Sequence, residues 1–340
     1  MKFLKKTIAV TLSLALGAGL TLTPAFAASF SDLQGVIDNQ TSLMDEEHNV
    51  RIGYDAGNIT LNEDITREEG EGSIKISGED TDVTLHLNGH TIDGAGKGGS
   101  VITVDNGAHL ALDGADKAGN KGIITGGNTD GNGGGINVAG GKADLDNVII
   151  KGNEAASGGG ISVGDIFEWR PEENGEVSVH KGELTVKNSV IEENTATEFG
   201  GGGIGIQRGE SDKPIEIVNT QIVNNKAQWG GAICVPNSDV VLDGVTVTGN
   251  KTLGDNGPGG ILFDVFGEGQ SYKITMKNGT AVYGNISWVG TEWEGDNDLF
   301  VRAQDGGTAT IEGDTSATNN GKTFDGWTYQ GDNIDKEPTF

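Results

Sequence analysis

Short runs of alternating apolar and polar residues recur along most of the chain, separated by glycine and asparagine. Three consecutive runs, Ile136–Val138, Ala143–Leu145 and Val148–Ile150, are typical. Alternation with a period of two indicates β-strands that bury one face, and the intervals between the runs are too short for crossover helices. The pattern therefore predicts an all-β chain of short strands and tight turns.

Two short phrases repeat with these strands, namely Gly-Gly-Gly-Ile or a close variant, and an apolar residue followed by x-x-Asn. The isoleucines of the first phrase are separated by 25, 43, 29 and 28 residues. A period near 25 residues that tolerates insertions is typical of a solenoid. We therefore expect a parallel β-helix, and crossover chirality favours the right-handed form. These isoleucines are Ile136, Ile161, Ile204, Ile233 and Ile261.

Stacked coils would place equivalent asparagines above one another. Their side-chain amides would then hydrogen-bond along the axis, and asparagine also tolerates the left-handed backbone of a tight corner. We interpret them as structural residues rather than as ligand contacts. The first predicted ladder is Asn153, Asn194, Asn225 and Asn250, and the second is Asn147, Asn188 and Asn219.

The first 27 residues have the features of a secretory signal peptide. A lysine-rich start precedes an uncharged apolar stretch, and Ala25-Phe26-Ala27 is a small-x-small cleavage site. The alternative, a membrane anchor, is disfavoured because the apolar run is short and ends at this site. We expect a secreted or cell-surface protein that does not insert into a membrane.

The rest of the chain divides into three predicted parts. Residues 28–55 form an N-terminal cap with a short capping helix, which begins at a capping box formed by Ser31 to Gln34. Residues 56–307 form the parallel β-helix, and residues 308–340 form the last coil and a polar C-terminal tail. Caps are needed because the end of a solenoid exposes sheet edges and apolar core.

Composition narrows the range of partners. The 340 residues include 50 Asp and Glu against 23 Lys and Arg, which gives a formal charge of −27. Such a chain repels nucleic acid and anionic membranes. The single cysteine, Cys234, excludes an intramolecular disulfide framework. We expect a monomer.

Insertions into the repeat fall at one corner. The intervals Val163 to Val186, Ile206 to Ile217 and Phe263 to Met276 are longer than the usual 7 residues. Insertions on one face of a repeat protein often mark its binding face, although aromatic residues there would equally seal the loops against the barrel wall. Residues of scarce types in these insertions are Phe167, Trp169, Arg170, Arg208, Phe266 and Tyr272, and a separate aromatic pair is Trp288 and Trp293. We predict that these residues bind a carbohydrate or a host surface.

A search for catalytic residues gives no consistent set. Asn128-Thr129-Asp130-Gly131 resembles one motif of polygalacturonase-like glycosidases, but their Asp-Asp pair, Gly-His-Gly and Arg-x-Lys motifs are absent from the sequence. The histidines have no zinc-site spacing. We expect no cofactor and no dedicated metal site, while weak Ca²⁺ binding by the loop oxygens of Asp296-Asn297-Asp298 and Asp255-Asn256 stays open.

The glycine and asparagine phrases of residues 120–290 resemble the polymorphic outer membrane protein family. Gly230-Gly231-Ala232-Ile233 matches the family's Gly-Gly-Ala-(Ile/Leu/Val) motif literally, whereas Ile or Val replaces the Phe of its Phe-x-x-Asn motif. The resemblance implies a bacterial secreted or cell-surface β-helix that is often adhesive. We therefore expect a non-catalytic, adhesin-like protein. The alternatives are a lyase or glycoside hydrolase acting on an acidic polysaccharide, and a plain structural spacer.

Overall fold

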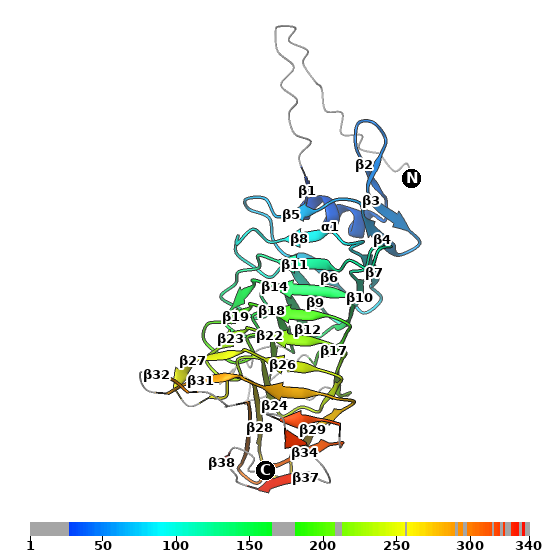
Figure 1. Cartoon of the computed structure of the whole chain (residues 1–340). Coiled ribbons are helices and arrows are strands. Elements are labelled where there is room, and N and C mark those ends of the chain that lie inside the picture. The colour runs from blue at the N-terminus through cyan, green and yellow to red at the C-terminus, as the bar shows by residue number, and fades with distance from the viewer. Residues whose placement is uncertain are drawn as a thin grey trace, which may run out of the picture.

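The computed structural model describes residues 27–164, 181–207, 213–255, 257–289, 292–294, 298–314, 316–319, 322–323, 328–332 and 335–336. Almost all of the regular structure in these residues is β-strand, arranged in four sheets that we call A to D (Figure 1). Between the two ends, most successive strands join different sheets, and each pairs in parallel with its equivalent one repeat later. This arrangement is compatible with a parallel β-helix.

Sheets A and B contain 11 and 12 strands. Sheet A consists of β1 (Ala28–Ser29), β5 (Ile65–Thr66), β8 (Thr91–Asp93), β11 (Gly122–Thr125), β14 (Val148–Lys151), β18 (Val190–Glu192), β22 (Gln221–Val223), β26 (Thr246–Thr248), β30 (Ala281–Tyr283), β35 (Thr318–Asn319) and β36 (Lys322–Thr323). Sheet B consists of β2 (Leu43–Met44), β3 (Val50–Asp55), β4 (Asn58–Leu61), β7 (Asp82–His86), β10 (His109–Asp113), β13 (Lys142–Asp146), β17 (Glu183–Lys187), β21 (Ile215–Val218), β25 (Val240–Asp243), β29 (Ser271–Lys277), β34 (Thr308–Gly313) and β37 (Thr328–Asp332).

Sheets C and D contain 9 and 6 strands. Sheet C consists of β6 (Ile74–Ser77), β9 (Ile102–Asp105), β12 (Ile136–Ala139), β16 (Ile161–Val163), β20 (Ile204–Ile206), β24 (Ile233–Pro236), β28 (Ile261–Phe266), β33 (Leu299–Gln304) and β38 (Asp335–Lys336). Sheet D consists of β15 (Glu154–Ala155), β19 (Thr195–Ala196), β23 (Lys226–Ala227), β27 (Lys251–Asp255), β31 (Ile286–Val289) and β32 (Glu292–Glu294). The repeat pattern predicts three strands in each coil, so sheet D is an addition.

The repeated isoleucines form one buried column in sheet C. Ile136 pairs with Ile161, Ile161 pairs with Ile204, and the series continues through Ile233 to Ile261. All five are buried in a single continuous apolar core. Residues that repeat along the sequence are thus stacked along one axis. Burial of such apolar columns supplies the main stabilisation of the fold.

A ladder of buried asparagines runs beside this column. Asn153 Nδ2 donates to Asn194 Oδ1, Asn194 to Asn225, and Asn225 to Asn250, each at 3.0 Å. The ladder continues through Asn285 and ends on the carboxylate of Asp298, at 2.8 and 2.7 Å. Each acceptor oxygen also receives a backbone N–H, as at Asn153 N to Asn194 Oδ1. The ladder therefore has a direction and ends on a group that only accepts.

The second set of asparagines does not form a continuous ladder. Asn147, Asn188 and Asn219 have φ values of 54°, 49° and 47°. Asn219 Nδ2 approaches Asn188 Oδ1 only at 3.5 Å, while Asn188 Nδ2 donates to Asp146 at 2.9 Å rather than to Asn147. Their shared property is the left-handed backbone at the corner between sheets B and A, which asparagine tolerates.

Helix α1 (Phe30–Asn39) packs near the N-terminal end of the sheets, and no described helix is long and apolar enough to cross a membrane. Its capping box is Ser29 with Asp32, so the prediction of a box at Ser31 to Gln34 was wrong. The earlier start allows Phe30, Leu33 and Val36 to be buried together. The Gln34 side chain pairs with both the N–H and the C=O of Lys75 on edge strand β6, at 2.7 and 3.0 Å.

Glu71 fixes the start of α1 and makes it sensitive to acid. Partial burial alone would raise the pKa of Glu71, but hydrogen bonds from Ser31, Glu68 and Ser29 lower this pKa to about 2 from 4.5. Because the folded-state pKa is depressed, this contribution to stability is present above about pH 4.5 and is lost as the pH falls towards 2. We expect Glu71→Gln to have a lower thermal midpoint than wild type near neutral pH, with a gap that closes between these two values. A difference in thermal midpoint between Glu71→Gln and wild type that is independent of pH would contradict this role of Glu71.

Both ends of the sheets contain antiparallel strands. At the N-terminal end of sheet B, β2 pairs with β3 and β3 pairs with β4. At the other end the chain reverses, and β36, β37 and β38 pair antiparallel with the last parallel strands of sheets A, B and C. Residues 308–336 thus contribute paired strands where the sequence predicts a last coil and a polar tail.

Candidate ligand-binding surface

The outer face of sheet B carries a groove across strands β7, β10, β13 and β17. Strand alternation sends Leu112 and Leu145 towards the core and their neighbours towards solvent. Between the outward side chains lies a hollow of about 370 Å³. Its lining is Thr84, Ala111, Leu112, Asp113, Asp144, Leu145, Asp146, Thr185 and Lys187.

A series of ionisable side chains in contact crosses the same face. His109 Nδ1 lies 3.0 Å from Asp82, and its Nε2 lies 2.9 Å from Asp144. Both ring nitrogens donate only when the imidazole is protonated. Lys142 Nζ lies 2.6 Å from the same oxygen of Asp144. The sequence places these residues on three successive strands, but only the parallel register brings them together.

Asp144 is held in its ionised form. Partial burial would raise the pKa of Asp144, but hydrogen bonds from Lys142, Thr185 and His109 lower this pKa below its usual value of 3.8. A general acid has to carry a proton near neutral pH, which calls for a raised pKa. Asp144 is therefore suited to accepting hydrogen bonds from hydroxyl or amide groups.

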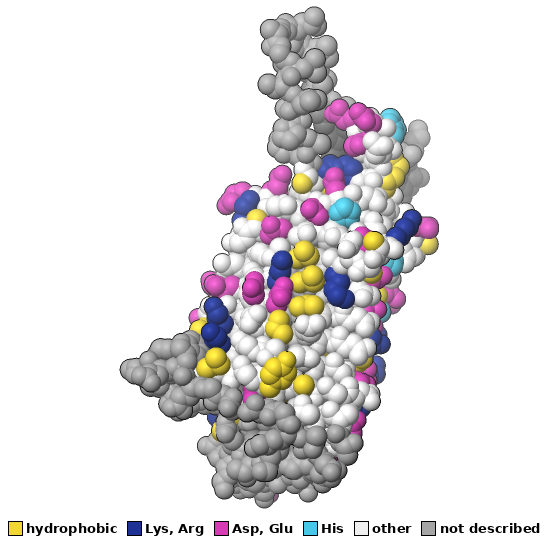
Figure 2. Space-filling view, viewed as in Figure 1, with side chains coloured by type: hydrophobic (Ala, Val, Ile, Leu, Met, Phe, Trp, Pro, Cys, Tyr) yellow, Lys and Arg dark blue, Asp and Glu magenta, His cyan; other side chains and the backbone are white. Residues whose placement is uncertain are grey.

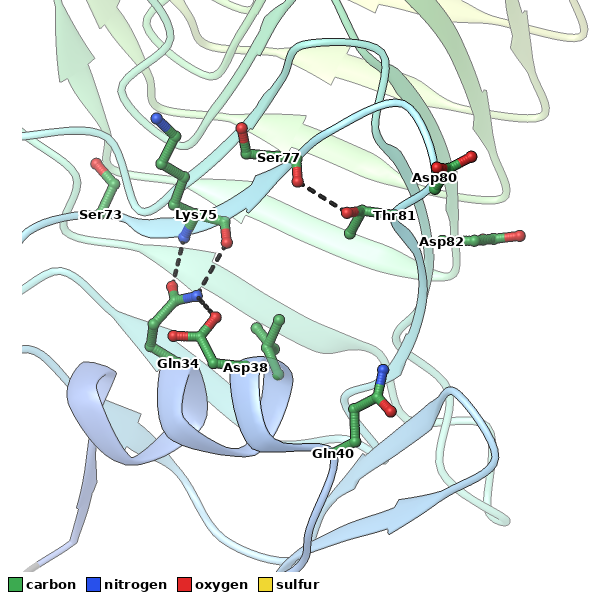
Figure 3. Close-up of a pocket in the computed structure, with 10 residues that line it drawn as sticks. Gln34, Asp38, Gln40, Ser73, Lys75, Ser77, Asp80, Thr81 and Asp82 are labelled. Carbon is green, nitrogen blue, oxygen red and sulfur yellow. Dashed lines mark hydrogen bonds between the residues drawn. The ribbon is translucent and has the colours of Figure 1, made fainter. Parts of the chain in front are cut away.

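A second hollow, of about 670 Å³, lies between α1, β6 and the turn that leads to β7 (Figure 3). One wall is Gln34, whose amide also donates to Asp38 at 2.9 Å. The opposite wall is the turn, where Thr81 Oγ1 donates to Ser77 O at 2.8 Å. The lining is Gln34, Ile37, Asp38, Gln40, Ser73, Lys75, Ser77, Asp80, Thr81 and Asp82.

The two hollows are joined by this series of side chains. Asp82 lines the second hollow and contacts His109, and His109 contacts Asp144, which lines the groove. We call this surface, from Gln34 through Asp82, His109 and Asp144 to Lys187, the sheet B strip. The strip runs along the axis of the stacked strands, so its shape suits an extended ligand.

The structure describes only some of the residues that the sequence predicts to bind a ligand. Phe167, Trp169, Arg170 and Arg208 lie outside the described residues. Phe266 ends β28, where its N–H donates to Asn237 Oδ1 at 2.9 Å. Tyr272, in β29, packs against the core and donates to Gln270 at 2.9 Å. The interval from Phe263 to Met276 thus consists of lengthened strands and a tight turn.

The aromatic pair Trp288 and Trp293 lies on the hairpin of β31 and β32, where the two residues are paired across the strands. This hairpin projects from the side of the stacked sheets (Figure 1). The structure describes its backbone but not these two side chains. The hairpin belongs to sheet D and does not border the sheet B strip.

Among the groups considered for metal binding or reactivity, the structure describes the side chains of Asp298 and Cys234. Asp298 ends the asparagine ladder, while Asp296, Asn297 and Asn256 lie outside the described residues. Within the described part of the chain, no three His, Cys, Asp or Glu residues are grouped to hold a metal ion. Burial and the nearby Asp264 carboxylate raise the pKa of Cys234 to about 12, which disfavours the nucleophilic thiolate form.

The outer face of sheet A differs from that of sheet B. Figure 2 shows hydrophobic side chains in a stripe over the strands of sheet A. Ile123, Ile149 and Val190 are register partners on β11, β14 and β18 and are half-buried. This face provides a matched surface for control substitutions.

Comparison of the chain with protein-family models, curated proteins and solved structures found no match. Its function is therefore inferred from its own residues and their arrangement.

Proposed function

We propose that the protein is a non-catalytic, adhesin-like protein of the cell surface or the extracellular medium that binds an extended glycan along the sheet B strip. The observation that carries this proposal is the alignment of two hollows whose lining residues Asp82 and Asp144 both contact His109.

The charged residues that line the groove indicate which class of glycan would bind. Asp113, Asp144 and Asp146 line the groove beside the single cation Lys187 of that lining. Carboxylates accept hydrogen bonds from sugar hydroxyls and repel uronic acids and sulfates. We therefore expect neutral or amino-sugar glycans rather than acidic polysaccharides.

A glycoside hydrolase is the second candidate, because several carboxylates share one groove as such a mechanism requires. The lowered pKa of Asp144 argues against its use as the acid. Release of reducing ends from neutral or acidic polysaccharides would replace the binding proposal with the catalytic one.

The proposal extends to architecture and location. A right-handed coil is supported by the strong chirality preference of parallel crossovers. A capping role for α1 is supported by Gln34, which occupies the free edge of β6 as another strand would. Export through cleavage of residues 1–27 is supported by the signal-peptide pattern.

A substitution in the groove tests the binding site. Thr185 points outward on β17 and lines the groove, so Thr185→Arg should fill it and reduce affinity for array-selected neutral glycans at least about tenfold. The matched control is Thr248→Arg on β26, which is also half-buried and points outward, but from sheet A. Glycan arrays followed by titration of the strongest binders give the measurement. Equal affinity of Thr185→Arg and wild type would exclude the groove.

A further inference from the structure

The boundary between exposed and buried backbone falls at a single peptide bond. Ala27 is exposed, whereas Ala28 is completely buried. Ala28 is also the first residue of β1, which pairs in parallel with β5 through Ala28 and Ile65. The first strand of sheet A thus begins immediately after the small-x-small site that the sequence offers to a signal peptidase.

A carboxylate is placed at the nitrogen of Ala28. Ala28 N lies 3.0 Å from Glu63 Oε1, within hydrogen-bond distance. The same oxygen lies 2.5 Å from Arg51 Nη2, and the Glu63 side chain is 31% exposed. Glu63 is therefore partly shielded from water and already ordered by a cation, so its position does not depend on Ala28 alone.

The next backbone donors also face carboxylates. Ser29 N donates to Asp32 Oδ2 at 2.9 Å. Phe30 N and Ser31 N donate to Glu71 at 3.3 and 2.8 Å. Three acidic side chains thus surround the start of β1 and α1, with Arg51 and the more distant Arg67 as the opposing cations. Such a field favours positive charge at the Ala28 nitrogen.

We propose that the structure contains a binding site for its own mature N-terminus, in which the Glu63 carboxylate holds the α-ammonium group of Ala28. An export-linked endopeptidase would hydrolyse the Ala27–Ala28 bond with one water molecule. Ala27 leaves with a carboxylate, and the freed amine of Ala28 takes up a proton. A neutral amide donor to Glu63 becomes a charged one, and charge-assisted hydrogen bonds are about twice as strong. Processing would thereby strengthen the attachment of β1 to β5.

This inference depends on the export that we propose, and the experiment separates the two. The full chain is expressed in a secreting bacterial host, and the N-terminus of the exported product is determined by intact mass and sequencing. A second full chain carries Gly-Ser inserted between Ala27 and Ala28, so that cleavage leaves the ammonium two residues away from Glu63. Both chains are also made with Glu63→Gln, which completes a double-mutant cycle.

The expected product begins at Ala28. In the cycle, Glu63→Gln should reduce the equilibrium constant for folding in both chains. The reduction should be about tenfold larger in the chain that starts at Ala28, because only that chain places its α-ammonium group beside Glu63. Should a Glu63→Gln chain fail to fold, acylation of the α-amine gives a second measurement. The Ala28 amine should react at least about tenfold more slowly than the Gly-Ser amine.

The results that would overturn the inference are distinct. A product that starts elsewhere, or no processing at all, removes the cleavage and the proposed export with it. A product that starts at Ala28 but shows no coupling to Glu63 and an ordinarily reactive amine leaves export intact and removes the ion pair.

Discussion

Replacing Asn225 by aspartate should destabilise the protein by about 3–5 kcal/mol, the cost of an uncompensated buried charge. Asn225 is completely buried and donates to Asn250 Oδ1 and to Ile191 O, at 3.0 and 2.9 Å. An aspartate at this position would still accept the hydrogen bond from Asn194. Its other carboxylate oxygen, however, would face Asn250 Oδ1 and Ile191 O with no proton to donate. The measurement is the midpoint and slope of denaturant unfolding.

The end of the same ladder provides the control. Asp298 accepts from both the N–H and the side-chain amide of Asn285, at 2.8 and 2.7 Å. Asp298→Asn keeps an oxygen that accepts these bonds, so the expected loss is about 1 kcal/mol or less. Equal losses for Asn225→Asp and Asp298→Asn would contradict the direction that we assign to the ladder.

Arg67→Met should cost about 3–5 kcal/mol, because it removes a buried guanidinium group that donates to four carbonyl groups, one of them on buried Ser100. Arg67 is completely buried, and its guanidinium group donates to the carbonyl oxygens of residues 97–100, among them Gly98 and Gly99 at 3.1 Å. It also lies 4.5 Å from the ring centre of Phe30, at the start of α1. Loss of the guanidinium should therefore loosen both the loop and the helix.

Denaturant unfolding with hydrogen exchange of α1 measures this effect. Lys213→Met is the control, because Lys213 is 67% exposed in its 3.0 Å pair with Glu183 and such surface pairs contribute about 1 kcal/mol or less. If Arg67→Met lost no more stability than Lys213→Met, the guanidinium would have no special role in holding the N-terminal region.

The stacking of the coils was accessible from sequence because burial leaves a periodic signature. Inward positions such as Ile136 and Ile161 recur with the repeat, and buried amides such as Asn153 recur with them. The start of α1 was misplaced by two residues because Ser29 and Ser31 each have a capping pattern, and only the burial of Phe30 decides between them.

The sheet B strip was not accessible in the same way. Asp82, His109 and Asp144 lie 27 and 35 residues apart and occupy outward positions, where no apolar requirement imposes a pattern. Their proximity follows only from the exact register between β7, β10 and β13. A search for outward polar residues at equal register in successive repeats would have found Asp82, His109 and Lys142, whereas Asp144 lies two residues further along its strand. Arg67 was missed because nothing near it in sequence marks it as buried.

The reversed strands at the C-terminal end limit how this rod can grow. New copies of the repeat, added by gene duplication, could not follow β36, β37 and β38 in parallel register, since these strands run opposite to the strands of the coils with which they pair. New repeats would have to be inserted between existing coils, where the strand edges of neighbouring coils already pair in parallel. Related proteins of different length should accordingly keep both ends and vary in the middle.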